Sequence, residues 1–408
     1  MSVSAPRSSV GGRIARFFPF SLATAILTLM GVQAPGLGPI AAALWLAMTA
    51  LLILMHPARF ADCLVRFWPL LLLPSLAAAS TLWSDLPAIS LRYGLQLWVT
   101  FAVAIFLVHL LGTGAFLRAL FLAMLTFCAL CLIHGGQGIS AEGLVLIGLT
   151  GSKNQMGYAA HLLLASALAV GLDRNASRSL RGLAVPGIML ALLILAQVHA
   201  ATAILISAGG SAFFLFFVVL RAMNTAMRVV VMSGLALMVI PIALIRPEID
   251  HGTQIFMQDV LKKDEGLTGR TFLWAHADAL VAQKPLLGRG YQAFWLGESV
   301  EAQGLKEWAG QKDGRGFHFH HSFKQLSVDL GYVGACLLGL MLALGVLSGI
   351  VKIWRGIELA ELAFLTLLLT YGARFFFELI VSPFSLQTLI FVASIAALWP
   401  KTPGPQRA

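Results

Sequence analysis

Charged residues are scarce in this sequence, and their scarcity excludes a soluble globular domain. Only 11% of the 408 residues are Asp, Glu, Lys or Arg, whereas 59% are hydrophobic and the mean hydropathy is +0.86. An ordinary soluble domain carries about 25% charged residues. A chain of this composition must place much of its apolar surface against lipid, and we therefore expect a polytopic membrane protein.

Cysteines are also few, and four scattered residues exclude a disulfide framework. Cys128 and Cys131 form a Cys-x-x-Cys pair, but it lies inside the apolar run FLAMLTFCALCLI, where cysteine behaves as a small hydrophobic residue. The formal charge of +10 comes without a basic tail or stripe, so nucleic-acid binding is not expected. No small-residue cleavage site follows the first apolar run, which predicts a retained first helix.

Long apolar runs are abundant, and each predicts a membrane-spanning helix of about 20 residues. They favour an all-α fold, a polytopic bundle of about twelve transmembrane helices. The predicted helices are 18–34, 36–55, 67–83, 93–111, 117–134, 154–172, 183–199, 201–220, 229–246, 322–350, 359–380 and 384–400. Basic residues gather between alternate runs, which predicts that both termini are cytoplasmic. The residues assigned to the cytoplasmic side are Arg7, Arg13, Arg16, Arg59, Arg66, Arg118, Arg174, Arg178, Arg181, Arg221, Arg228, Lys352, Arg355, Lys401 and Arg407.

These helices divide the chain into five segments. They are a cytoplasmic tail at 1–17, helices within 18–246, a large outward loop at 247–321, helices within 322–400 and a cytoplasmic tail at 401–408. The outward loop holds ten of the 18 carboxylates. A long charged loop in an otherwise economical membrane protein usually carries function.

Two elements are predicted inside the outward loop. The stretch TFLWAHADALVAQKP predicts an amphipathic helix that ends at Lys284-Pro285. Its predicted apolar face consists of Leu273, Ala277, Leu280 and Val281. The stretch LLGRGY that follows predicts a glycine turn.

Six polar residues stand at predicted outer helix ends or in the loop, where each has a functional and a structural interpretation. They are Lys153, Asn154, Arg270, Arg289, Arg374 and Glu378. The arginines can bind phosphate oxygens bidentately, or they can be solvated surface residues. Lys153 can extend its ammonium group to the lipid headgroups. Arg374 and Glu378 are four residues apart, so a shared helix face predicts either an ion pair between helices or substrate contact.

Three histidines, His318, His320 and His321, precede the tenth predicted helix. No cysteine lies nearby and the loop acids lack metal-ligand spacing, so a metal site is not expected. A neutral imidazole at the membrane surface suits a general base, and it is equally compatible with a polar residue at the interface.

Three stretches together change this balance: GSKNQMG, LTGRTFLWAHADALVAQKPLLGRGYQAFW and HHSFKQLSVDLGYVG. In this order they resemble the O-antigen ligase and polymerase superfamily of bacterial inner-membrane glycosyltransferases. Members carry Lys-Asn at a mid-chain helix start, then Arg, a nearby Trp, Pro-x-x-Gly-x-Gly, and His-Asn followed nine residues later by Gly-x-x-Gly. Here His320 and His321 occupy the His-Asn pair, and Gly331 and Gly334 close the motif. The resemblance in motifs covers 268–334.

The resemblance implies a glycan on an undecaprenyl diphosphate carrier as donor and a sugar hydroxyl as acceptor, with no metal or cofactor. It implies His320 as general base and Arg270 as a catalytic cation, with Lys153, Asn154, Arg289, His321, Arg374 and Glu378 binding substrate. Two positions depart from the pattern. His321 replaces an amide or hydroxyl residue, and Ala200-Ala201 stands where many members have Ser-Arg.

The motif details favour a polymerase of exopolysaccharide repeat units over a ligase that transfers glycan to lipid A core. A transporter or flippase would place polar residues at the membrane midplane in repeated halves, and no such repeat is found in the sequence. A non-catalytic scaffold is a further alternative. The implied localisation is the bacterial inner membrane with the active site facing the periplasm. A chain-length regulator and a flippase are the implied protein partners.

Overall fold

The computed structural model describes Ile26 and residues 38–140, 143–231, 233, 269–297, 299–310 and 317–400. Two predicted helices, 18–34 and 229–246, lie almost entirely outside the described residues. Both predicted tails and the first part of the outward loop, up to residue 268, lie outside them as well.

The described chain is mostly helical, as predicted. Its helices are α2 (Gly38–Met55), α3 (Pro57–Arg66), α4 (Trp68–Ala79), η1 (Ser80–Leu82), α5 (Pro87–Leu111), α6 (Thr113–His134), α7 (Lys153–Leu172), α8 (Arg178–Val198), α9 (Ala201–Ala222), α12 (Arg270–Gln283), α13 (Ala293–Leu296), α14 (Val300–Trp308), α15 (Ser322–Arg355), α16 (Leu359–Arg374) and α17 (Leu386–Leu398). Every predicted run inside the described residues coincides with one of these helices.

Among the described residues, 7 helices are long and apolar enough to cross a membrane: α2, α5, α6, α7, α8, α9 and α15. The pair formed by α3 and α4–η1 is bent by 87° and makes the number up to 8 if it counts as one span. Helices α16 and α17 are shorter, with 16 and 13 residues. The structure thus agrees with a polytopic helical membrane protein, while the count of twelve spans stays a prediction.

The structure differs from the predicted layout in one element and in one helix boundary. An antiparallel hairpin of β1 (Gly136–Ser140) and β2 (Gly143–Gly148) connects α6 to α7. Glycine disfavours the helix, and Val and Ile favour the strand, so this short segment folds into a hairpin. The second difference is that α16 ends at Arg374, six residues before the predicted end at 380.

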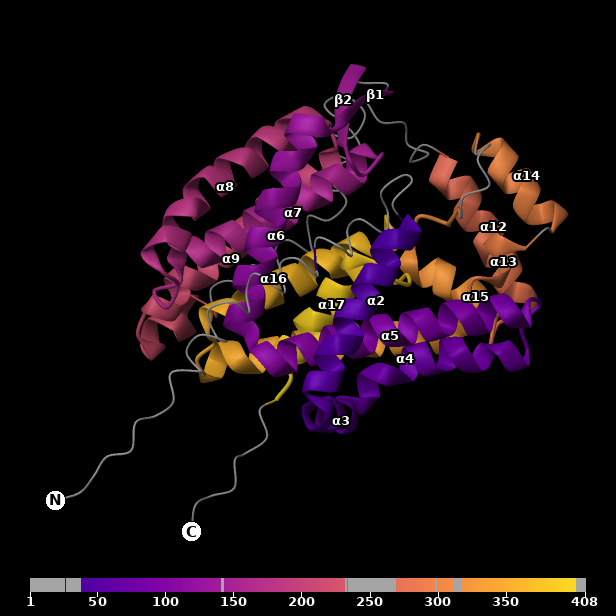
Figure 1. The fold of residues 1–408 in the computed structure, drawn as a ribbon, viewed down its shortest axis with the longest axis horizontal. Coiled ribbons are helices and arrows are strands. Elements are labelled where there is room, and N and C mark those ends of the chain that lie inside the picture. The colour runs from indigo at the N-terminus through magenta and orange to yellow at the C-terminus, as the bar shows by residue number, and fades with distance from the viewer. Residues whose placement is uncertain are drawn as a thin grey trace, which may run out of the picture.

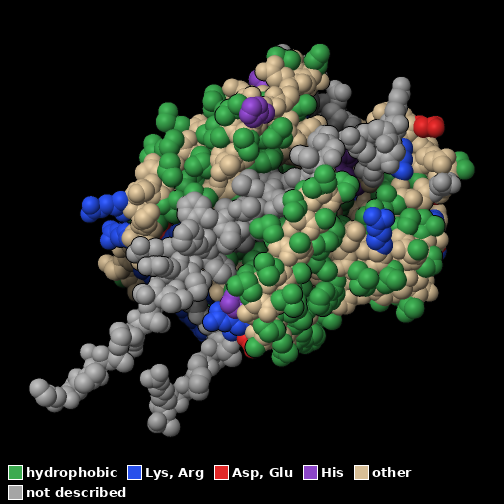
Figure 2. All heavy atoms as spheres, viewed as in Figure 1, with side chains coloured by type: hydrophobic (Ala, Val, Ile, Leu, Met, Phe, Trp, Pro, Cys, Tyr) green, Lys and Arg blue, Asp and Glu red, His purple; other side chains and the backbone are tan. Residues whose placement is uncertain are grey.

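The helices pack in two groups joined by the C-terminal pair. In Figure 1, α6, α7, α8 and α9 lie together on one side and α4 and α5 on the other. Helix α16 contacts α6, α7 and α9 of the first group, and α17 contacts both α16 and α5 of the second group. The loop helices α12, α13 and α14 lie together at one end of α15. Figure 2 shows a broad hydrophobic surface over α2 with few charged side chains, as expected for a surface that faces lipid.

One end of the bundle brings together segments that are distant in sequence, and we call it the histidine end. It contains the starts of α7, α12 and α15 and the end of α16. The backbone N–H of Ser322 donates to the carbonyl of Phe375 at 2.7 Å, and the Ser322 hydroxyl donates to the carbonyl of Glu378 at 2.7 Å. These bonds fix the start of α15 beside the end of α16, directly after the three histidines.

Candidate functional site

The outward loop has a small hydrophobic core of its own, which places its polar residues. The predicted amphipathic helix is α12, and the four residues of its predicted apolar face are buried as expected. They pack with Phe294 and Trp295 of α13, Leu305 of α14, Phe319 and Val328. Phe319 and Val328 come from the histidine stretch and from α15, so this core attaches the loop to the membrane helix.

The predicted glycine turn docks on a break in α15. Gly331 has φ 67° and ψ −170°, which interrupts the helix and leaves backbone groups without helical partners. The turn satisfies two of them, because the N–H of Arg289 donates to the Val328 carbonyl at 2.9 Å and the N–H of Gly290 donates to the Asp329 carbonyl at 2.8 Å. The Pro-x-x-Gly-x-Gly stretch therefore joins the loop to α15 through the main chain.

Only glycine fits at the two closest points of this contact. A Cβ at Gly331 would lie 2.1 Å from the carbonyl oxygen of Leu286, and one at Gly288 would lie 2.5 Å from the carbonyl carbon of Asp329. Both glycines also have positive φ, at 67° and 65°. These contacts give a physical reason for glycine at motif positions that the sequence identified by resemblance alone.

His320 has a left-handed backbone, with φ 51°. A non-glycine residue there is strained by about 1–2 kcal/mol, so the surroundings must hold it in place. The preceding residue is held from both sides. The Phe319 N–H donates to Gln325 Oε1 at 3.3 Å, and the Phe319 carbonyl accepts from Trp274 Nε1 at 2.9 Å. Phe319 itself is fully buried, so the main chain entering His320 is clamped.

The three histidines are held in the neutral form. Burial lowers the pKa of His320 to about 2, with smaller contributions from His318 and Arg270. Burial lowers the pKa of His318 to about 4, and Arg270 again adds to the shift. The pKa of His321 is lowered to about 4, first by burial and then by Lys324. The Nδ1 atom of His320 is buried without a hydrogen-bond partner among the described residues.

His321 has a local structural task that explains why it departs from the family pattern. It is the N-cap of α15, and its Nδ1 accepts from the backbone N–H of Lys324 at 3.4 Å. Asn and Ser perform this task at helix starts through their side-chain oxygens. An imidazole nitrogen therefore replaces the usual amide or hydroxyl at this position. Its ring also meets Trp274 edge-on, with centroids 5.4 Å apart.

Arg270 lies near Glu378 and close enough to the histidines to act on their pKa values. Its Nη2 is 3.8 Å from Glu378 Oε1, and the same carboxylate oxygen accepts from Asn154 Nδ2 at 3.2 Å. Arg270 also acts on the pKa values of His318 and His320, as described above. The structure thus brings together three predicted site residues from α7, α12 and the segment after α16, beside the histidines.

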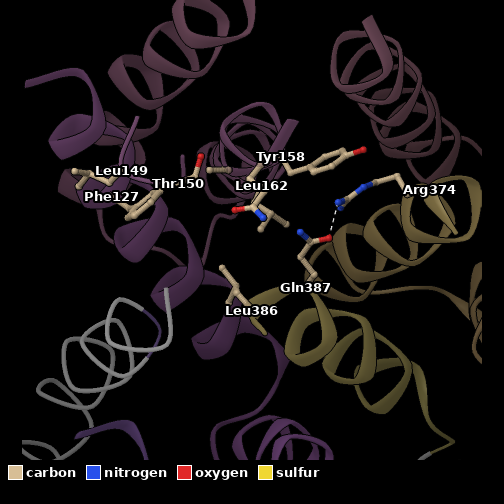
Figure 3. Close-up of a pocket in the computed structure, with 10 residues that line it drawn as sticks. Phe127, Leu149, Thr150, Tyr158, Leu162, Arg374, Leu386 and Gln387 are labelled. Carbon is tan, nitrogen blue, oxygen red and sulfur yellow. Dashed lines mark hydrogen bonds between the residues drawn. The ribbon is translucent and has the colours of Figure 1, made fainter. Parts of the chain in front are cut away.

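Helix α16 ends at Arg374, but the backbone N–H of Glu378 still donates to the Arg374 carbonyl at 2.9 Å, so the two residues lie one helical turn apart, with Glu378 beyond the helix end. The Arg374 guanidinium stacks on Tyr158, with Cζ 3.0 Å from the ring centroid, and Nη2 donates to Gln387 at 2.6 Å. Figure 3 shows Arg374, Tyr158 and Gln387 beside a cavity of about 40 Å³, whose other wall includes the apolar Leu162. Arg374 is only 1% exposed, and its Nε has no hydrogen-bond partner among the described residues.

Arg289 lies in a different cluster. Its Nη1 is 3.3 Å from Asp85 Oδ2, its Nη2 donates to Gln283, and Lys284 Nζ is 2.5 Å from Asp85 Oδ1. No contact recorded between described residues joins this cluster to Arg270. Lys153, in contrast, begins α7 next to Asn154 and so lies at the histidine end. The roles of both cations in binding stay predictions.

Three residues of this site were missed from the sequence: Tyr158, Gln325 and Gln387. Gln325 is 1% exposed, and it also accepts from Trp295 Nε1 at 3.0 Å. A polar residue inside a long apolar run is costly unless it is paired, and this signal could have identified Gln325 and Gln387. Tyr158 directly follows the stretch GSKNQMG and had no property that singled it out.

The described residues contain no group of three or more His, Cys, Asp or Glu side chains able to hold a metal ion. The three histidines therefore do not form a metal site with the carboxylates that the structure describes. Metal independence of the activity stays a prediction.

Apolar helices of spanning length, with a polar cluster at one end, define the chain as a polytopic helical membrane protein. Residues 186–339 match a family model described as O-Antigen ligase. The chain is also 27% identical over 270 residues to the exopolysaccharide production protein ExoQ of Rhizobium meliloti (strain 1021). This match covers 65% of the chain and 61% of that protein. The predicted resemblance to the O-antigen ligase and polymerase family is confirmed.

Proposed function

We propose that the protein transfers a glycan from a polyprenyl diphosphate carrier to a sugar hydroxyl at the outer face of the inner membrane. In this reaction the acceptor oxygen attacks the anomeric carbon of the donor. The bond from that carbon to the diphosphate oxygen breaks, the carrier diphosphate leaves with the electron pair, and the acceptor proton passes to His320. The observation that carries the proposal is that Arg270 lies near both Glu378 and His320.

Arg270 suits the stabilisation of a leaving diphosphate. Its contact with Glu378 is long, at 3.8 Å, and both side chains are less than one-fifth exposed. A partly buried cation with such a loose partner is available to a stronger anion, and shielding from water increases its effect on growing charge. Glu378 balances Arg270 in the free protein, while Asn154 fixes the carboxylate.

His320 is proposed as the general base. Its low pKa keeps the imidazole unprotonated at every physiological pH, which leaves it free to accept a proton. A weak base also has a small driving force for proton transfer. A bound diphosphate would make His320 a stronger base, because a nearby negative charge raises the pKa of a histidine. The proposal therefore couples donor binding to activation of the base.

Arg374 is proposed to supply the cation that many family members place at the Ala200-Ala201 position. Gly157 of α7 packs closely against α9 here, since a Cβ on it would lie 2.6 Å from that of Ala203 and 3.6 Å from that of Ala200. Tyr158, the next residue, carries the Arg374 guanidinium. A cation thus reaches this neighbourhood from α16 instead of from α9. Lys153 is proposed to contribute at the same end.

Polymerisation of repeat units is the form of this reaction that we favour. The relative is named for exopolysaccharide production, which requires many additions of a lipid-linked unit to a growing chain. Ligation to lipid A core is the second candidate, favoured by the description of the matching family model. A chain-length regulator and a flippase remain the proposed protein partners.

The proposal is tested with purified protein and a polyprenyl-diphosphate-linked repeat unit as both donor and acceptor. Replacement of a general base removes about 10²–10⁴-fold of the rate, so H320A and R270A should reduce chain extension by at least about 100-fold. H276A is the matched control, because among the described residues this histidine of the same loop bonds the backbone carbonyl of Phe272 and lies against its ring.

Polymer of normal length from both H320A and R270A would contradict catalysis and favour a scaffold. Wild-type protein is also assayed with a chelator, where unchanged activity is expected. Activity lost in chelator and restored by a divalent ion would contradict the metal-independent mechanism. Transfer to lipid A core without extension of the repeat unit would replace polymerase with ligase.

A further inference from the structure

A second polar region lies at the opposite end of the bundle, which we call the arginine end. It contains the end of α7 and the start of α16, whereas the histidine end contains the start of α7 and the end of α16. A cavity of about 790 Å³ opens there. Its polar wall contains four arginines and two carboxylates, namely Arg118, Arg174, Arg181, Arg221, Asp173 and Glu358. The wall therefore has two positive charges in excess.

The arginines differ in how far they are already used. Arg118 donates to Asp173 Oδ2 from Nη2 at 2.8 Å and from Nε at 3.2 Å, and Arg181 donates to the Gly171 carbonyl at 3.4 Å. Arg174 and Arg221 are exposed, and within the described chain their side chains have no hydrogen-bond or ion-pair partner. These two guanidiniums supply the excess charge, and both border the same hollow.

Apart from Asn175 and two glycines, the rest of the cavity wall is apolar. It is formed by residues of α6, α7, α9 and α16, namely Leu117, Ala169, Leu172, Val218, Ala222, Leu359 and Ala360. A site for a soluble anion needs no such surface. A cationic rim above an apolar wall between membrane helices matches a phospholipid, whose phosphate is anionic and whose chains are apolar.

We propose that this cavity binds the headgroup of an anionic phospholipid, with Arg174 and Arg221 on its phosphate. The enrichment of arginine in cytoplasmic loops explains why basic residues occur at this end, but it does not require them to surround one cavity. Arg178 shows the difference, because it begins α8 in the same loop and does not line the cavity. Figure 2 shows Lys and Arg side chains at the edge of the molecule where the ends of α8 and α9 lie.

The affinity of the whole protein for lipid is measured in detergent by native mass spectrometry and by the rise in Tm on lipid addition. Probes are phosphatidylglycerol, diphosphatidylglycerol with two phosphates, zwitterionic phosphatidylethanolamine and inorganic pyrophosphate. Wild type should bind the anionic lipids at least about tenfold more tightly than an R174Q/R221Q variant, since the variant loses both charge-assisted contacts to the phosphate. R178Q, the matched control, should bind as wild type does.

Several outcomes would overturn the proposal. Equal affinity of wild type and R174Q/R221Q for anionic lipid would do so, as would equal binding of phosphatidylethanolamine by wild type. Pyrophosphate binding as tight as that of the lipids would assign the cavity to a soluble anion instead. Tighter binding of diphosphatidylglycerol than of phosphatidylglycerol would support the match to two excess charges. Glycan transfer is not part of the readout, so this test stands apart from the proposed function.

Discussion

The two ends of the bundle use arginine in opposite ways. At the histidine end, Arg270 and Arg374 are largely shielded from water and each already contacts a polar side chain. At the arginine end, Arg174 and Arg221 are exposed beside a wide cavity. The histidine end also has an unusual backbone, because it contains the left-handed His320 and the helix break at Gly331.

Under the two proposals, the difference corresponds to two solutions to anion recognition. A cation that must stabilise charge at one atom benefits from fixed geometry and exclusion of water. A cation that holds a lipid headgroup needs only long-range attraction, which tolerates many orientations. We therefore expect the histidine end to be sensitive to changes of a single contact, and the arginine end to respond mainly to the total charge.

The largest effect is expected from G331A, which attacks the docking of the loop. The backbone strain alone costs about 1–3 kcal/mol, and the added Cβ would collide with the Leu286 carbonyl 2.1 Å away. The Tm in detergent should fall by several degrees, or the protein should fail to accumulate. G339A on the same helix is the control, because its Cβ would meet only Phe323 at 3.8 Å. Equal Tm values for the two variants would show that the turn does not need this break.

An intermediate effect is expected from W274F, which removes the donor to the Phe319 carbonyl and keeps an aromatic ring. The loss of one buried hydrogen bond is worth about 1 kcal/mol, so kcat should fall about fivefold to tenfold while KM for the donor stays unchanged. W308F is the control in the same loop, because its contact with Phe272 is between rings. A rise in KM with unchanged kcat would show that Trp274 acts in binding and does not position His320.

The smallest effect is expected from pH. Because the pKa of His320 is lowered to about 2, the free protein keeps this imidazole neutral as the pH falls through 6.5, the usual value for histidine. The kcat/KM profile should therefore show no loss of activity from His320 between about pH 5 and 8. A midpoint near 6.5 in kcat/KM would mean that His320 is exposed to water in the working enzyme.

Much of the fold could be predicted because apolar length and periodicity determine it. The face of α12 was identified residue by residue, since only one arrangement buries Leu273, Ala277, Leu280 and Val281 together. The hairpin was missed because five or six residues rich in glycine give too short a pattern to identify a strand. The early end of α16 was missed because apolar residues continue past Arg374 and give no stop signal.

The candidate site could be predicted only as a set of residues. Motif spacing in the sequence identified His320 and Arg270 as candidates. The structure adds that Arg270 lies near Glu378, which is 108 positions later in the chain. Sequence spacing could not show that Arg289 turns toward Asp85, because that contact joins the loop to the start of α5. It could not show that Arg374 stacks on Tyr158 either, since the two residues lie on different helices.

The attachment of residues 285–290 to α15 has a consequence for how such proteins diversify. The recorded hydrogen bonds in this joint run between backbone groups, while the side chains of Leu286 and Leu287 are 68% and 42% exposed. A joint of this kind places few demands on the side chains at positions 286 and 287. Under the proposed function, the outward loop could therefore change its surface, and with it the sugars it admits, while the joint keeps it in the same position beside α15.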